Sequence, residues 1–243
     1  MNETGSTNKK KNVAVQEDTP LITFLLPCCN TPLLTSDFLY VASESKMFDK
    51  CAFALLLDAF DPSLAIYKEL INKVRNLGLN VGYFIFDGTP YIGKINKAAM
   101  IIDTVSLCVL DNKHLPAVVS ESKTKSIYEH IIGWLSHSAE PMKVGLFGQS
   151  MEFPIVTKKF IERIGYMFHT LSFGRKESEV WLLQLAQELE ILSVIPDCQI
   201  IETSAKTFEL EGFSTEDDQR WVVDALMHTI DDVSKQIEFY KVK

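Results

Sequence analysis

The chain has 243 residues, of which 47% are hydrophobic and 23% are charged, a composition typical of a globular protein with a substantial core. Its 24 basic and 32 acidic side chains give a formal net charge of -8, which disfavours a general role in binding nucleic acids or anionic membranes. No apolar run approaches the roughly 20 residues of a membrane span, and the polar start lacks the apolar segment of a secretory signal. We therefore expect a soluble, cytoplasmic protein without a membrane span.

The five cysteines form neither a CxxC pair nor the Cys/His spacing of a zinc site. Buried, reduced thiols are the expected state, since three of the five lie in apolar runs. The sequence also contains no P-loop and no G-x-G-x-x-G pattern, which are the strongest signals for a bound nucleotide. We therefore expect no metal and no cofactor.

Apolar runs alternate with helical periodicities after a polar tail at residues 1–19, which we expect to be disordered. Continuous apolar runs predict strands at 21–26, 38–42, 51–57, 80–86, 144–147, 166–173 and 199–203. Apolar residues at helical spacing predict helices at 61–77, 126–135, 154–164, 178–192 and from 214 onward, with a weaker helix and strand between 95 and 110. This alternation predicts one three-layer α/β domain over residues 20–243, with a mostly parallel sheet and helices on both faces.

A serine turn stands out at Ser150, just after the apolar run that ends at Phe147. A strand, a tight serine turn and a helix in this order form the nucleophile elbow that exposes a hydroxyl above a parallel sheet. The full pattern is G-x-S-x-G, and here Glu152 replaces the last glycine, which a sharp turn favours because it lacks a Cβ. A serine that caps the helix predicted after it is the structural alternative.

The order of the turns resembles the α/β-hydrolase fold over roughly residues 50 to 240. The segment Leu55-Leu-Leu-Asp-Ala-Phe-Asp-Pro-Ser63, the turn at Asp87-Gly88 and the serine turn follow one another as the oxyanion turn, the acidic turn and the elbow of that family do. The segment 195–208 looks like the final strand and loop that carry its histidine. The resemblance implies a catalytic set whose members are Ser150 as nucleophile, Glu177 or Glu179 as acid, His228 as a substitute base, and Asp58, Gln149 and Met151 at the oxyanion turn.

The residues that the family needs for catalysis are incomplete in this chain. Asp58 stands at the oxyanion turn, where its carboxylate would repel a developing negative charge. Lys206 or Thr207 stands where the histidine should fall, and a serine without a base is a poor nucleophile. We therefore expect a non-catalytic interaction or scaffold protein with a protein partner. The first alternative is a serine hydrolase or acyltransferase that acts on an ester or thioester through Ser150, with a small acyl ligand.

Aspartates follow several of the predicted strands, at Asp58, Asp61, Asp87 and Asp111. The carboxyl ends of parallel strands meet at one edge of a sheet, so these side chains could line a crevice for a nucleotide or a divalent metal ion. Ordinary turn and cap chemistry is the commoner reason for an aspartate after a strand. A flavodoxin-like nucleotide-binding module is therefore the second alternative.

Overall fold

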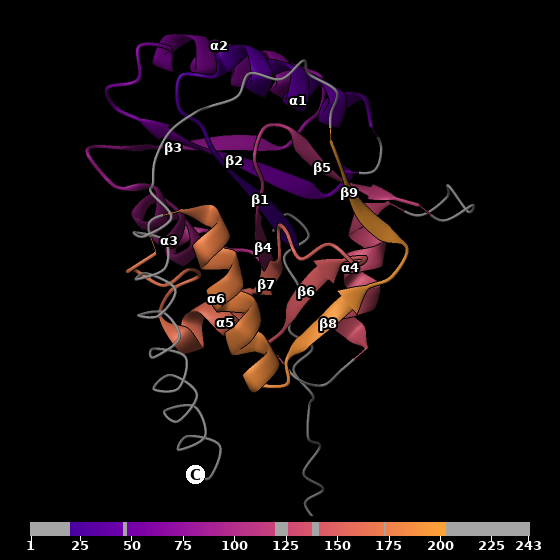
Figure 1. Cartoon of the computed structure of the whole chain (residues 1–243). Helices are drawn as coiled ribbons and strands as arrows, with labels where there is room; N and C mark the ends of the chain where they lie inside the picture. Colours follow the sequence, from indigo (N-terminus) through magenta and orange to yellow (C-terminus); the bar gives the residue numbers. More distant parts are fainter. Residues whose placement is uncertain (1–19, 46–47, 120–125, 138–140, 173, 203–243) are drawn as a thin grey trace, which may run out of the picture.

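The computed structural model describes residues 20–45, 48–119, 126–137, 141–172 and 174–202. A sheet of seven strands in the order β3-β2-β1-β4-β7-β6-β8 runs through the molecule (Figure 1). Its strands are β1 (Ile22–Pro27), β2 (Cys51–Asp58), β3 (Val81–Phe86), β4 (Ser106–Val109), β6 (Val144–Phe147), β7 (Ile155–Thr157) and β8 (Leu192–Ile195). A second, two-stranded sheet pairs β5 (His114–Val118) with β9 (Cys198–Glu202) in antiparallel fashion.

The large sheet is mostly parallel, as the sequence predicts. Strand β1 pairs in parallel with both β2 and β4, and β2–β3 and β6–β8 are parallel as well. The exception is β7, which runs antiparallel to both of its neighbours, β4 and β6. The three-layer α/β architecture is therefore confirmed, with one short reversed strand in the middle of the sheet.

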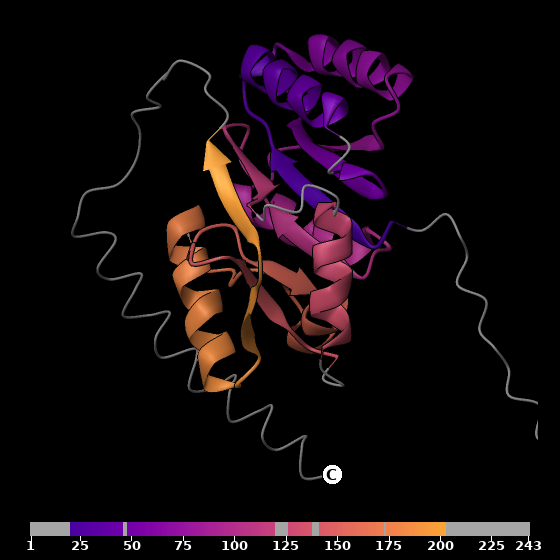
Figure 2. The same ribbon diagram turned by 90° about the vertical axis from the view of Figure 1, so that its right-hand side faces the viewer.

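Helices cover both faces of the sheet, on opposite sides in Figure 2. One layer contains α1 (Pro32–Glu44), α2 (Leu64–Asn76) and α4 (Ile127–Ser136), and the other contains α3 (Tyr91–Ile101), α5 (Lys158–Ile164) and α6 (Arg175–Glu188). In β1 the side chain of Phe24 packs with the first layer and that of Leu25 with the second. Strands covered on both faces read as unbroken apolar runs, which is why β2 is visible in the sequence. None of the helices in the described ranges has the length and hydropathy that crossing a bilayer requires.

Three predicted elements are wrong. Residues 38–42 belong to helix α1, which starts at Pro32 and buries Phe38, Leu39 and Ala42 along one side. The helix predicted at 154–164 is strand β7 followed by the shorter α5, and the described part of 166–173 forms turns rather than a strand. The tail at 1–19 and the helix predicted from 214 onward lie outside the described residues.

The order of the strands reverses between β1 and β4. The chain builds outward from β1 to β2 and β3, and then returns to the other side of β1 to form β4. In open α/β sheets, ligands bind beyond the carboxyl ends of the strands at such a reversal. The loops that follow β1 and β4 therefore indicate where a site is expected.

Candidate functional site

Backbone hydrogen bonds accepted by Asp61 and Tyr67 fix the loops that follow β1 and β2. The carboxylate of Asp61 accepts the backbone N–H groups of Asn30 and Ser63, each at 2.7 Å. The hydroxyl of Tyr67 on α2 accepts the backbone N–H of Thr31 at 2.8 Å. Because both oxygens of Asp61 accept backbone donors, this buried residue holds the shape of the two loops.

A side-chain contact connects the β1 loop with the loop after β4, across the reversal of strand order. The amide nitrogen of Asn112 donates to the hydroxyl oxygen of Thr31 at 2.9 Å. Nearby on β2, the carboxylate of Asp58 pairs with the ammonium group of Lys94 on α3, and Lys94 is buried. A buried ammonium group needs an anionic partner, so Asp58 and Lys94 neutralise each other.

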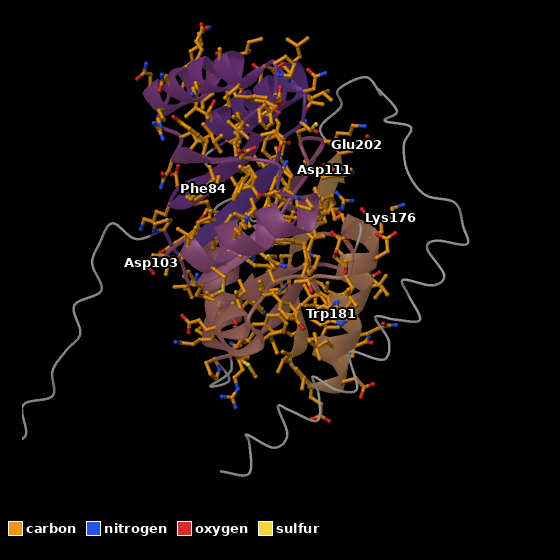
Figure 3. All side chains as sticks on the ribbon, turned by 90° about the vertical axis from the view of Figure 1, so that its left-hand side faces the viewer. Phe84, Asp103, Asp111, Lys176, Trp181 and Glu202 are labelled. Atoms are coloured by element: carbon orange, nitrogen blue, oxygen red, sulfur yellow. The ribbon has the colours of Figure 1, made fainter. Side chains whose placement is uncertain are left out.

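Asp111 lies two residues beyond the end of β4 and receives three donors. Its Oδ1 accepts the backbone N–H of Lys113 at 2.9 Å and lies 2.8 Å from Nδ1 of His114, while its Oδ2 accepts Nη1 of Arg175 at 2.7 Å. Burial raises the pKa of Asp111, but these hydrogen bonds lower it more, so the carboxyl titrates below its usual range. Figure 3 shows Asp111 close to the start of α6, where Lys176 lies.

Arg175 is the first residue of α6 and contacts carboxyl groups from two elements. Besides its bond to Asp111, its Nε lies 3.4 Å from Oε1 of Glu179, one turn further along α6. The guanidinium carbon lies 4.2 Å from the centre of the Phe153 ring. Burial lowers the pKa of Arg175, but the two carboxyl groups raise it more, so the side chain stays a cation.

Glu179 is a buried carboxyl group at the floor of this cluster, with only 4% of its surface exposed. Burial raises its pKa to about 7, although Arg175 and a 3.2 Å hydrogen bond from the backbone N–H of Phe153 favour the ionised form. Phe153 makes this bond from a left-handed conformation with φ 56, which is uncommon for a bulky residue. A carboxyl group that titrates near neutral pH is suited to taking up or releasing a proton.

We expect Glu179 to make the protein less stable as the pH rises from about 4.5 to about 7. The folded state holds the proton of Glu179 up to about 7, whereas the unfolded carboxyl loses it near 4.5. The stability that protonated Glu179 contributes is therefore fully present below the pKa of the unfolded state, and it is lost as the pH rises through the pKa of the folded state. Urea unfolding across this range measures it, and Glu179→Gln should flatten the decline. Identical pH profiles for the two proteins would contradict the expectation.

The predicted nucleophile, Ser150, lies in the loop between β6 and β7. Its hydroxyl oxygen accepts the backbone N–H of Glu152 at 3.2 Å, and no histidine within the described part of the chain hydrogen-bonds to it. Gln149 and Met151 are exposed on either side. A nucleophile elbow has a helix directly after the serine turn, but here strand β7 follows. The predicted elbow is therefore wrong, and so is the alternative that Ser150 caps a helix.

The other predicted site residues are dispersed. Glu177 lies in the first turn of α6, Asp58 is bound to Lys94, and Asp87 is exposed after β3. His228, Lys206 and Thr207 lie outside the described residues. Of the four aspartates that follow strands, Asp61 and Asp111 each hold one of the two loops that the hydrogen bond between Asn112 and Thr31 joins. Arg175 is a site residue that the sequence did not predict, because its partner Asp111 is 64 residues away in the chain and no local pattern reveals the contact.

The comparisons with known proteins match structures but no sequence families. No protein-family model and no curated protein matches the sequence. S. aureus TarS, residues 1–349 in complex with UDP-GlcNAc, has a TM-score of 0.62 at 11% identity over 87% of this chain and 66% of that one. The mannosyltransferase PcManGT from Pyrobaculum calidifontis, in complex with GDP-Man and Mn2+, has a TM-score of 0.51 at 11% identity over 73% and 54%. The chain thus spans less than two thirds of the length of either structure.

This shared fold overturns the resemblance to α/β hydrolases. The turns that carried the resemblance follow parallel strands in any α/β sheet, so their order does not distinguish one such fold from another. The scaffold function, the serine hydrolase or acyltransferase and the flavodoxin-like module inferred from the sequence are therefore wrong. The protein partner and the acyl ligand expected with them have no support in this fold.

Proposed function

We propose that this protein binds a nucleotide sugar at the carboxyl ends of β1, β2 and β4 and transfers its glycosyl group to an acceptor. The observation that carries the proposal is the cluster of Asp111, Arg175 and Glu179 beside the reversal of strand order. The fold similarity supports it, because TarS and PcManGT were both solved with nucleotide sugars bound. Fold similarity alone does not assign an activity, so the proposal depends on the chemistry of this chain.

The loops after β1 and β2 offer a place for the nucleoside. Asp61 and Tyr67 hold these loops in shape, so a ligand would meet a preformed surface. Phe60, on the loop after β2, exposes 79% of its surface to solvent. A base can stack on an exposed aromatic ring, so we infer that Phe60 forms one wall of the nucleoside site.

The cluster provides the groups that the transfer reaction needs. The bond between the anomeric carbon and the diphosphate oxygen breaks and its electron pair leaves with the diphosphate, while an acceptor hydroxyl forms the new bond to that carbon. The proton of the hydroxyl must go to a base whose pKa lies near the working pH. We assign Glu179 as the proton acceptor, because its Oε1 lies 3.4 Å from Nε of Arg175 within the cluster and because burial raises its pKa to about 7.

The PcManGT complex contains Mn2+, but the residues of this site do not fit a divalent metal ion. Mg2+ and similar hard cations need several oxygen ligands. Both oxygens of Asp111 already accept protein donors, one of them a guanidinium. The described residues contain no group of three or more His, Cys, Asp or Glu side chains that could hold a metal.

Calorimetric titration with UDP, GDP, UDP-GlcNAc and GDP-mannose tests the proposed function. We expect at least one of these ligands to bind with a Kd of roughly 1–100 μM, and Phe60→Ala to weaken that binding about fivefold through lost stacking. Tyr83→Ala is the matched control, because Tyr83 is an exposed aromatic residue within the edge strand β3. If none of the four ligands binds the folded protein, the proposed function is wrong.

A further inference from the structure

The carboxylate of Asp111 is committed to the protein itself. It receives a backbone N–H from Lys113, a side-chain contact from His114 and a hydrogen bond from Arg175. A metal ion that kept these three donors in place could use only the remaining lone pair of Oδ2, and it would lie beside the Arg175 guanidinium. Two cations held against one carboxylate repel each other, most strongly where little water screens them. The site therefore disfavours a divalent cation by its charge as well as by its shortage of ligands.

The guanidinium of Arg175 is a cation that contacts the protein's carboxyl groups on one side and keeps a donor for a ligand on the other. Nη1 binds Asp111 and Nε approaches Glu179, whereas Nη2 makes no hydrogen bond to any residue that the structure describes. The side chain keeps 19% of its surface exposed, so the guanidinium is held in place and still reachable by a ligand. Phe153 packs against its face and fixes the plane of the donors. A planar guanidinium binds phosphate oxygens through paired N–H donors.

Other cations lie in the same two segments. Lys113 is on the loop after β4, and Lys176 follows Arg175 in the first turn of α6, near Asp111 in Figure 3. The same two segments also contain the carboxyl groups of Asp111, Glu177 and Glu179, so basic and acidic side chains are equal in number here, whereas the whole chain has a net charge of -8. An anionic ligand such as a diphosphate would therefore be repelled less here than by the chain as a whole.

We propose that Arg175 takes the place of a divalent cation, bridging Asp111 to the diphosphate of the nucleotide sugar, so that binding needs no metal ion. This inference rests on the nucleotide-sugar function proposed above. As the glycosyl bond breaks, the leaving diphosphate gains negative charge, and the N–H donors of Arg175 stabilise that charge. The start of α6 thus provides both the cation for the leaving group, at Arg175, and the acceptor for the proton, one turn later at Glu179.

Calorimetric titration of UDP and GDP into the full chain, once in EDTA and once in Mn2+ or Mg2+ at equal ionic strength, tests the inference. We expect the Kd of the nucleotide that binds to agree within about twofold between the two buffers. Binding that appears only with the metal would overturn the inference and leave the proposed function standing. Failure of both nucleotides in both buffers would overturn the inference, and the proposed function is overturned as well if UDP-GlcNAc and GDP-mannose also fail to bind.

Variants of Arg175 provide a second measurement in EDTA. Arg175→Ala should raise the Kd about ten- to a hundredfold, as expected for loss of a hydrogen bond between charged groups, and Arg175→Lys should recover part of the affinity. Arg75→Ala is the matched control, because the Nε of Arg75 donates to the carbonyl of Val81 at the opposite, amino end of β3. Thermal melting confirms that each variant is folded. A folded Arg175→Ala protein with unchanged affinity would overturn the inference.

Discussion

Glu179→Gln should lower the rate at which the bound nucleotide sugar releases its nucleoside diphosphate by about a hundredfold or more. Glutamine keeps the size of the side chain and can still accept the backbone N–H of Phe153, which lies 3.2 Å away. It cannot take up the proton of the acceptor hydroxyl, so the chemical step should slow while the nucleotide still binds. The measurement pairs the initial rate with the Kd of the nucleoside diphosphate.

The pairing of rate and affinity separates this role from a structural one. A Kd within about threefold of the original, together with the large loss of rate, would show that the proton step is affected rather than the fold. Glu188→Gln is the matched control, because Glu188 is exposed at the end of the same helix. Equal rates for Glu179→Gln and Glu188→Gln would exclude Glu179 as the proton acceptor.

Gly148→Ala should destabilise the protein by about 3 kcal/mol, through strain and a steric clash together. Gly148 has φ 63, a conformation that costs an L-residue free energy, and a Cβ at this position would lie 2.5 Å from the carbonyl oxygen of Cys198. Backbone atoms cannot move aside as the end of a side chain can. The turn after β6 would have to move away from β9, and the melting temperature should fall by about 10 °C.

Gly78→Ala isolates the conformational part of that effect. Gly78 has φ 93, but a Cβ there would have no atom within 4 Å. Its substitution should cost only about 1 kcal/mol, because strain acts without a clash. Urea unfolding of both variants gives the two free energies. If Gly148→Ala lowers the free energy of unfolding no more than Gly78→Ala does, the close approach to Cys198 does not contribute to the loss of stability.

The layers of the fold could be predicted because they depend on local patterns. The unbroken apolar run of β2 (Cys51–Leu57) indicates a strand covered on both faces, and the helical spacing of Tyr67, Leu70, Ile71 and Val74 indicates one buried side of α2. Strand β7 was predicted as the start of a helix over 154–164, and its antiparallel direction could not be predicted either, because strand pairing is not a local property. Three buried residues before a helix look the same in sequence whether the strand is parallel or antiparallel.

The candidate site was only half visible in the sequence. Asp61 and Asp111 stand out because they follow strands, and the edge of the sheet brings their loops together. Arg175 reaches Asp111, and brings Glu179 into the cluster, only because α6 starts beside the carboxyl end of β4, and that placement is set by packing of residues such as Trp181 in the core. Glu179 was weighed only as a hydrolase acid. Its raised pKa arises from burial, which no sequence pattern shows.

The antiparallel strand β7 also affects how the molecule responds to a ligand. Strands β1 to β4 lie on one side of it and β6 and β8 on the other, and β4 meets β7 over only three residue pairs. Asp111 belongs to the first half and Arg175 to the second. A ligand held between these two residues would link the halves across β7, which meets β4 over three residue pairs and β6 over two. The two halves could then separate only after the ligand is released. Ligand binding would therefore make unfolding of the two halves more cooperative.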